Sequence, residues 1–93
     1  MSENLEDLTI SYSEGTLETV KELDKKILSK GAWTTIIFKY QDWESAKNAY
    51  GPEKYSIRRY QKRNGQYWQQ SKFNISSREQ AQKIIDVLTD WLK

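Results

Sequence analysis

Apolar residues recur at two different spacings along this 93-residue chain, and each spacing predicts a different element. Residues 32–41 (AWTTIIFKYQ) are rich in β-branched and aromatic side chains, the composition of a strand. Strict alternation gives this strand two faces, and we expect the core face to carry Thr34, Ile36, Phe38 and Tyr40.

Near the C-terminus the apolar spacing changes to three and four, which predicts an amphipathic helix. Ser76, followed three positions later by Glu79, has the spacing of a capping box and marks the expected start of the helix. We expect the apolar stripe of this helix to serve as core and as a dimer contact, through Ala81, Ile84, Ile85, Leu88, Trp91 and Leu92.

Two further strands are predicted at residues 54–63 and 66–75, joined by the hairpin signal Asn64-Gly65. Alternation in the first of them places Tyr55, Ile57 and Arg59 on one face and four residues on the other: Ser56, Arg58, Tyr60 and Lys62. In the second, Phe73 and Ile75 are expected inward, and the outward set is Trp68, Gln70, Lys72 and Asn74.

Residues 16–30 fit two elements. Their apolar positions recur at helical spacings, and Thr16 could cap a helix that ends at Gly31. The alternative is a strand, with Gly31 as the turn before the next strand. Residues 42–53 are interpreted as a loop, in which Trp43 and Tyr50 either pack over a sheet edge or offer stacking surfaces.

Charge is distributed unevenly, although the net charge is only +2. Residues 1–24 hold seven acidic residues against one lysine, and residues 1–15 are interpreted as an acidic disordered tail. Residues 54–78 carry seven cations and no acid, with five aromatic side chains between them. Such asymmetry indicates a nucleic-acid or other anionic partner. We therefore expect residues 16–93 to form a single nucleic-acid-binding domain.

The chain contains no cysteine and no histidine. Thiolate and imidazole catalysis and the usual zinc sites are therefore excluded, and we expect no enzyme activity, no metal and no cofactor. No window is apolar enough for a membrane helix, and the acidic start differs from a secretory signal. We expect a cytoplasmic protein with no membrane partner and no small-molecule substrate.

Interleaved cations and aromatic rings favour single-stranded nucleic acid, because the cations attract phosphates and exposed rings stack on unpaired bases. The candidate binding residues are Arg58, Tyr60, Lys62, Trp68, Gln70, Lys72, Lys39, Lys54 and Arg63. The rival hypothesis is a protein-interaction module whose basic sheet face docks an acidic partner.

The run SIRRYQKRNGQYWQQSKFNISSREQAQKI resembles the single-stranded DNA-binding module of the positive-cofactor-four transcriptional coactivators. The similarity rests on Ile57-Arg58-Arg59-Tyr60, the turn at Asn64-Gly65, and Lys72 before Ile75-Ser76. The segment KYSIRRY also resembles a strand of small bacterial relatives. The sequence departs from the family pattern at Gln61, where an aromatic is usual, at Asn74, where glycine is usual, and in the turn at residues 51–54.

The resemblance implies an α+β fold, in which a four-stranded antiparallel twisted sheet is followed by one C-terminal helix that forms a homodimer. It implies a first strand at about residues 19–29, and we adopt the strand there. Arg58 matches the strand arginine of the family, and Lys72 matches its basic position before the Ile-Ser pair. The expected function is single-stranded DNA (or RNA) binding with little sequence preference, as an accessory factor of transcription, replication or repair. In a bacterium the protein would be associated with the nucleoid.

Overall fold

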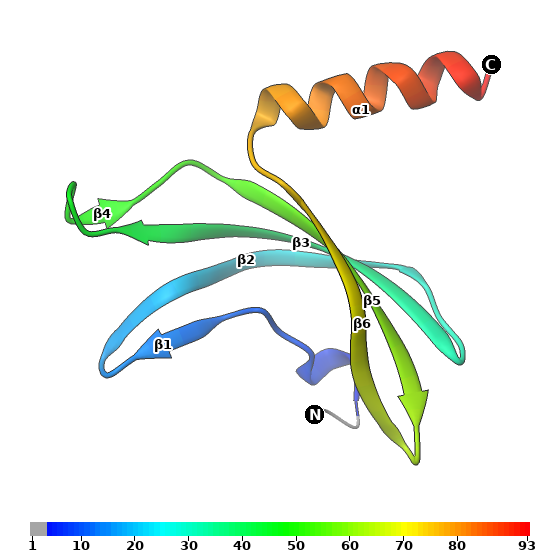
Figure 1. The fold of residues 1–93 in the computed structure, drawn as a ribbon, viewed down its shortest axis with the longest axis horizontal. Coiled ribbons are helices and arrows are strands. Elements are labelled where there is room, and N and C mark those ends of the chain that lie inside the picture. Colours follow the sequence, from blue (N-terminus) through cyan, green and yellow to red (C-terminus); the bar gives the residue numbers. More distant parts are fainter. Residues whose placement is uncertain (1–3) are drawn as a thin grey trace.

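A curled antiparallel sheet with the strand order β1-β2-β3-β5-β6 dominates the computed structural model, which describes residues 4–93 (Figure 1). A short strand, β4, pairs with β3 outside this order. The elements are β1 (Tyr12–Glu14), β2 (Leu17–Ser29), β3 (Trp33–Glu44), β4 (Ala49–Tyr50), β5 (Lys54–Arg63), β6 (Gln66–Ile75) and α1 (Arg78–Trp91).

The α+β class and the antiparallel sheet with one C-terminal helix are confirmed. The expected count of four strands is not confirmed: in the described residues the sheet has six strands, because β1 and β4 join the long strands β2, β3, β5 and β6. The β5–β6 turn has the left-handed backbone of a primed hairpin turn, with φ of 51° at Asn64 and 77° at Gly65.

Strand β2 settles the ambiguity of residues 16–30 in favour of a strand. The register of β2 against β3 shifts between Glu22 and Asp24 and again between Ile27 and Ser29. Each shift inserts one residue, Leu23 and then Leu28, so the apolar positions lose strict alternation. The helix-like spacing of apolar residues in this segment therefore results from two β-bulges.

The segment predicted as a loop at residues 42–53 is partly strand, and in this respect the prediction was wrong. Strand β3 continues to Glu44 and turns back through β4, which brings the rings of Trp43 and Tyr50 to 5.1 Å in an edge-to-face pair. These two rings pack against each other, and the Tyr50 hydroxyl donates a hydrogen bond to the Glu18 carbonyl oxygen at 2.7 Å.

The core lies on one side of the sheet, which we call the core face, and includes all four predicted residues of β3: Thr34, Ile36, Phe38 and Tyr40. A segment that we call the N-terminal strap, residues 4–14, covers this face through the buried side chains of Leu8 and Ile10. The expectation of a disordered tail is therefore wrong for residues 4–15, because two apolar side chains anchor them. Residues 1–3 lie outside the described part of the chain.

Strand β2 holds the strap with two charged side chains. The Lys25 ammonium donates hydrogen bonds to the carbonyl oxygens of Leu5, Glu6 and Leu8 at 2.9, 2.9 and 2.6 Å. The Glu22 carboxylate accepts from the Thr9 hydroxyl at 2.7 Å. The three Lys25 bonds satisfy backbone carbonyl groups of a segment that, before β1, has no strand partner.

Helix α1 projects from the end of β6, on the other side of the sheet from the strap (Figure 1). Its N-cap is Ser77, whose hydroxyl accepts a hydrogen bond from the backbone N–H of Gln80 at 3.1 Å. The predicted capping box, Ser76 with Glu79, is therefore wrong by one position. No residue of α1 is buried, so the expected core role of its stripe is also wrong within this single chain. No helix in the described chain is long and apolar enough to span a membrane.

Candidate nucleic-acid interface

The basic hairpin formed by β5 and β6, here called the β5–β6 arm, carries most of the predicted site on two opposite faces. The register shifts between Arg59 and Tyr60, so that Lys72 pairs with Arg58 whereas Trp68 pairs with Gln61. The extra residue is Gln70. This bulge reverses the alternation along β6, so the prediction that Trp68 and Lys72 share a face was wrong.

On the core-face side of the arm, Arg58 is fixed by neutral side chains. Its Nε donates to the Ser56 hydroxyl at 3.0 Å, and its Nη1 donates to the Gln69 amide oxygen at 3.0 Å. The Ser56 hydroxyl in turn donates to the Asn74 amide oxygen at 2.7 Å. These bonds hold the guanidinium in place. They also occupy the Gln69 and Asn74 amide oxygens as acceptors.

What remains at this place is a set of hydrogen-bond donors. The amide oxygens of Gln69 and Asn74 accept internal hydrogen bonds, which leaves their NH₂ groups and the remaining guanidinium N–H groups as donors. Lys72, which pairs with Arg58 across the two strands, adds an ammonium on the same face. We call Arg58, Gln69, Lys72 and Asn74 the donor cluster. Such a set matches an anion, because anions only accept hydrogen bonds.

Electrostatics at the donor cluster also favours an anion. Arg58 and Lys72 lie directly opposite each other on neighbouring strands, and like charges in that position destabilise a sheet. Among residues 4–93, no carboxylate lies within ion-pair distance of either side chain. A bound phosphate would relieve the repulsion.

Two other predicted residues of this face differ from expectation. Tyr60 is only 4% exposed and belongs to the core, so it offers no stacking surface. Burial raises the pKa of its phenol above 10.0, with the Arg58 charge acting in the opposite direction. Lys62 is exposed near the tip of the arm, with its ammonium 5.5 Å from the centre of the buried Tyr67 ring.

The opposite side of the sheet, which we call the outer face, carries Trp68 and Arg63. Trp68 is 41% exposed. Arg63 donates two hydrogen bonds to the Gln61 amide oxygen, from Nε at 3.0 Å and from Nη2 at 2.7 Å. Gln70 lies in the bulge, and its amide donates to the Trp68 carbonyl oxygen at 3.4 Å.

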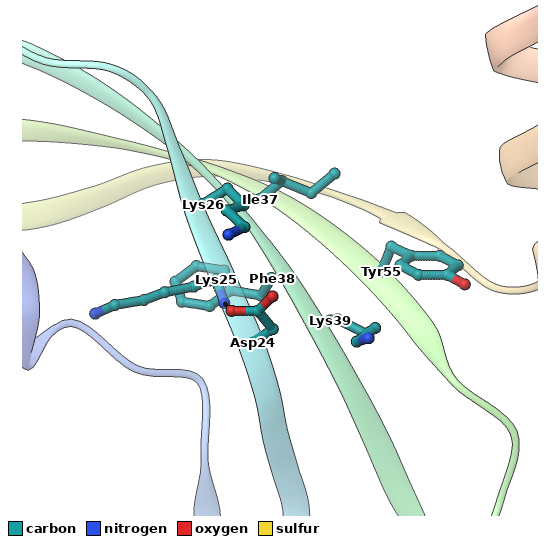
Figure 2. Close-up of a pocket in the computed structure, with 7 residues that line it drawn as sticks. All are labelled: Asp24, Lys25, Lys26, Ile37, Phe38, Lys39 and Tyr55. Atoms are coloured by element: carbon teal, nitrogen blue, oxygen red, sulfur yellow. Dashed lines mark hydrogen bonds between the residues drawn. The ribbon is translucent and has the colours of Figure 1, made fainter.

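Lys39 and Lys54 lie away from both groups. Lys39, Tyr55 and Asp24 are among the residues that line a small open pocket of about 160 Å³. Figure 2 draws these residues, and Asp24 pairs with Lys39 on the neighbouring strand. Lys54 forms an ion pair with Asp42 at 3.0 Å, and that hydrogen bond raises the pKa of the lysine above 10.5. Both lysines thus have a carboxylate nearby, unlike Arg58 and Lys72.

The sequence prediction missed Trp33 as a candidate ligand-binding residue. Its ring is 41% exposed, and the guanidinium carbon of Arg59 lies 4.6 Å from the ring centre. Trp33 pairs with Gln61, which pairs with Trp68 on its other side, so the two indoles belong to one row across three strands. Alternation along β3 puts Trp33 on the face opposite Thr34, but only the register reveals its alignment with Trp68.

Comparison of the chain with protein-family models, curated proteins and solved structures finds no match.

Proposed function

We propose that the protein binds single-stranded nucleic acid with little sequence preference, and that the donor cluster holds a backbone phosphate. The observation that carries the proposal is the facing pair Arg58 and Lys72, which has donors around it and no ion-paired carboxylate among residues 4–93. A guanidinium held in a fixed plane suits phosphate oxygens, which accept its N–H groups in pairs.

Two further features support nucleic acid over a small anion. The acid-free arm continues past the donor cluster to Lys62 on the same side of the sheet and to Arg63 on the outer face, which gives further cations for successive phosphates. Every residue of β6 from Trp68 to Asn74 is exposed, so an extended ligand has an open path along this strand. The resemblance to single-stranded DNA-binding coactivators agrees with both features.

The proposal is tested by titrating a labelled single-stranded oligomer, DNA or RNA, and its duplex with wild type, Arg58→Ala and Lys72→Ala. We expect the single strand to bind more tightly than the duplex. Each substitution should weaken binding and reduce the slope of log affinity against log salt by about one ion. Lys47→Ala is the matched control, because it removes an exposed cation from the β3–β4 turn, outside the arm.

Equal weakening by Lys47→Ala would mean that only overall charge matters, and equal affinity for duplex would remove the preference for single strands. Arg58→Ala also loses two internal hydrogen bonds, so its thermal unfolding is measured alongside. Lys72→Ala loses none of the hydrogen bonds described at the cluster and is the cleaner probe. Binding of an acidic protein without any oligomer binding would favour the rival function, docking of an acidic partner.

A homodimer is part of the proposal. A groove of about 450 Å³ separates α1 from the outer face, and apolar side chains line both sides, among them Ile37, Ile57, Ile85 and Leu88. The accessible surface is 6702 Å². A compact monomer of 11.1 kDa is expected to expose about 5,700 Å². The excess of about 1,000 Å² is close to what each partner buries in a standard interface, about 800 Å².

The proposed role is that of an accessory factor in transcription, replication or repair, without enzymatic activity or a cofactor. We place it in the cytoplasm, and on the nucleoid if the protein is bacterial.

A further inference from the structure

The outer face of the β5–β6 arm ends in a row of side chains that we call the indole row: Trp33, Gln61 and Trp68. Both tryptophans are 41% exposed, which is unusual for the largest aromatic side chain at two positions of one cross-strand row. Only Gln61 lies between them, and its amide oxygen is occupied by Arg63. The row is thus two indole rings separated by one strand.

Cations border the indole row, and acids do not. Arg59 stacks on Trp33, and the guanidinium of Arg63 is held at Gln61 by two hydrogen bonds. No acidic residue occurs on β5 or β6. Planar rings flanked by guanidinium groups present stacking surfaces next to positive charge, which is the chemistry that recognises a base attached to a phosphate.

A second copy of the chain is a poorer occupant of this surface. On the outer face, the polar row Thr35, Arg59 and Ser71 separates the indole row from the apolar row Ile37, Ile57 and Phe73. The apolar groove beneath α1 begins only beyond that polar row. The indoles are therefore not continuous with the surface that a dimer would cover.

We propose that the indole row stacks two unpaired bases of the strand whose phosphate binds at the donor cluster, an inference that rests on the proposed function. Trp33 and Trp68 lie on strands two positions apart, about 10 Å at the usual strand spacing. Neighbouring bases on one strand of a duplex lie only about 3.4 Å apart. One base on each indole therefore requires an unstacked single strand. Strand β6 is the edge of the described sheet, so the ligand reaches the outer face around that edge.

The test compares oligothymidylate with an abasic oligomer of the same length, which keeps the phosphates and lacks the bases. Wild type should bind oligothymidylate at least about tenfold more tightly than the abasic oligomer. Trp33→Ala and Trp68→Ala should each weaken oligothymidylate binding by at least about fivefold and leave the abasic affinity unchanged. Trp43→Ala is the matched control, because Trp43 packs on Tyr50 at the other end of β3.

A second measurement does not depend on the alanine variants folding. In the chain with Trp43→Phe and Trp91→Phe, only Trp33 and Trp68 emit indole fluorescence. Oligothymidylate should quench this emission, and the abasic oligomer should leave it unchanged.

Three results would overturn the inference. If wild type bound the two oligomers with equal affinity, base stacking on the indoles would be contradicted, while the proposed function would stand. If neither oligomer bound, both the stacking inference and the proposed function would be contradicted. Emission that changes with protein concentration alone, and not with oligomer, would assign the indoles to a second copy of the chain.

Discussion

At the scale of single residues, the surroundings of a cation distinguish a binding group from a structural one. Lys54 has Asp42 at 3.0 Å and Lys25 donates to three strap carbonyls, so both have internal partners. Arg58 is held by neutral oxygens and faces Lys72. In the sequence these four cations look alike, whereas in the fold only the last two are poised for an external anion.

Tyr60 gives a prediction at this scale. Tyr60→Phe should leave oligomer affinity unchanged, because the ring is core and not surface. Its effect should appear at alkaline pH. Burial raises the pKa of the folded phenol, so the stability linked to its neutral form is present below the unfolded pKa of about 10 and is lost as pH rises through the folded pKa.

Denaturant unfolding of wild type and Tyr60→Phe between about pH 9 and pH 11 measures this effect. The wild type should lose more stability over that interval than the variant. Contributions from groups that both proteins share cancel in the comparison. Identical pH profiles would show that the phenol ionises as easily in the fold as in the unfolded chain.

At the scale of elements, the N-terminal strap acts as the second layer of the core. Phe38 and Ile36 are fully buried, although α1 lies on the other side of the sheet, because the strap covers them. Removing residues 4–15 would uncover these side chains, so we expect such a deletion to destabilise the fold.

Leu8→Ala tests the strap as a core element. We expect a loss of about 2–4 kcal/mol in the free energy of unfolding, since a buried leucine leaves both its transfer energy and a cavity behind. Leu28→Ala is the matched control: Leu28 is 58% exposed, so its truncation should cost less than about 0.5 kcal/mol. Urea unfolding at one protein concentration measures both. Equal small losses would mean that the strap does not contribute to the core.

At the same scale, β-bulges determine which face of the sheet a side chain occupies. One bulge in β6 decides that Trp68 aligns with Trp33 and not with Lys72, and two bulges in β2 turn its apolar pattern away from strict alternation. A bulge shifts every later side chain of its strand to the opposite face.

At the scale of the whole molecule, a single chain leaves many of its large apolar side chains exposed. Its radius of gyration is 15.0 Å, against about 12 Å for a compact domain of this length, and the shortest extent is 17 Å. Trp91 and Leu92 are 75% and 81% exposed at the end of α1. An isolated chain with these features gains from association.

Sedimentation equilibrium should give twice the 11.1 kDa chain mass at micromolar concentrations. Leu88→Glu should shift the mass toward the monomer, because it places a charge in the groove between α1 and the outer face. Thr89→Glu adds the same charge at an exposed neighbouring position outside the residues that line the groove, and should leave the dimer intact. A monomeric wild type would contradict the dimer directly.

The sequence alone determined the elements whose signals are local. Alternation in β3 predicted its core residues, and the Asn64-Gly65 turn predicted both strands of the arm to their observed ends. These signals depend on backbone preferences and side-chain periodicity within about ten residues, and they do not require knowledge of a partner strand.

Only the tertiary structure decided which distant residues meet. The strap packs on the core face through Leu8 and Ile10. The acidic composition of residues 1–15 gives no indication of this contact. The register of β5 against β3 places Tyr60 in the core. The same register and the one-residue bulge in β6 align Trp33 with Trp68 on one face. Register depends on contacts between strands far apart in the chain, and a shift of one residue moves every side chain to the other face.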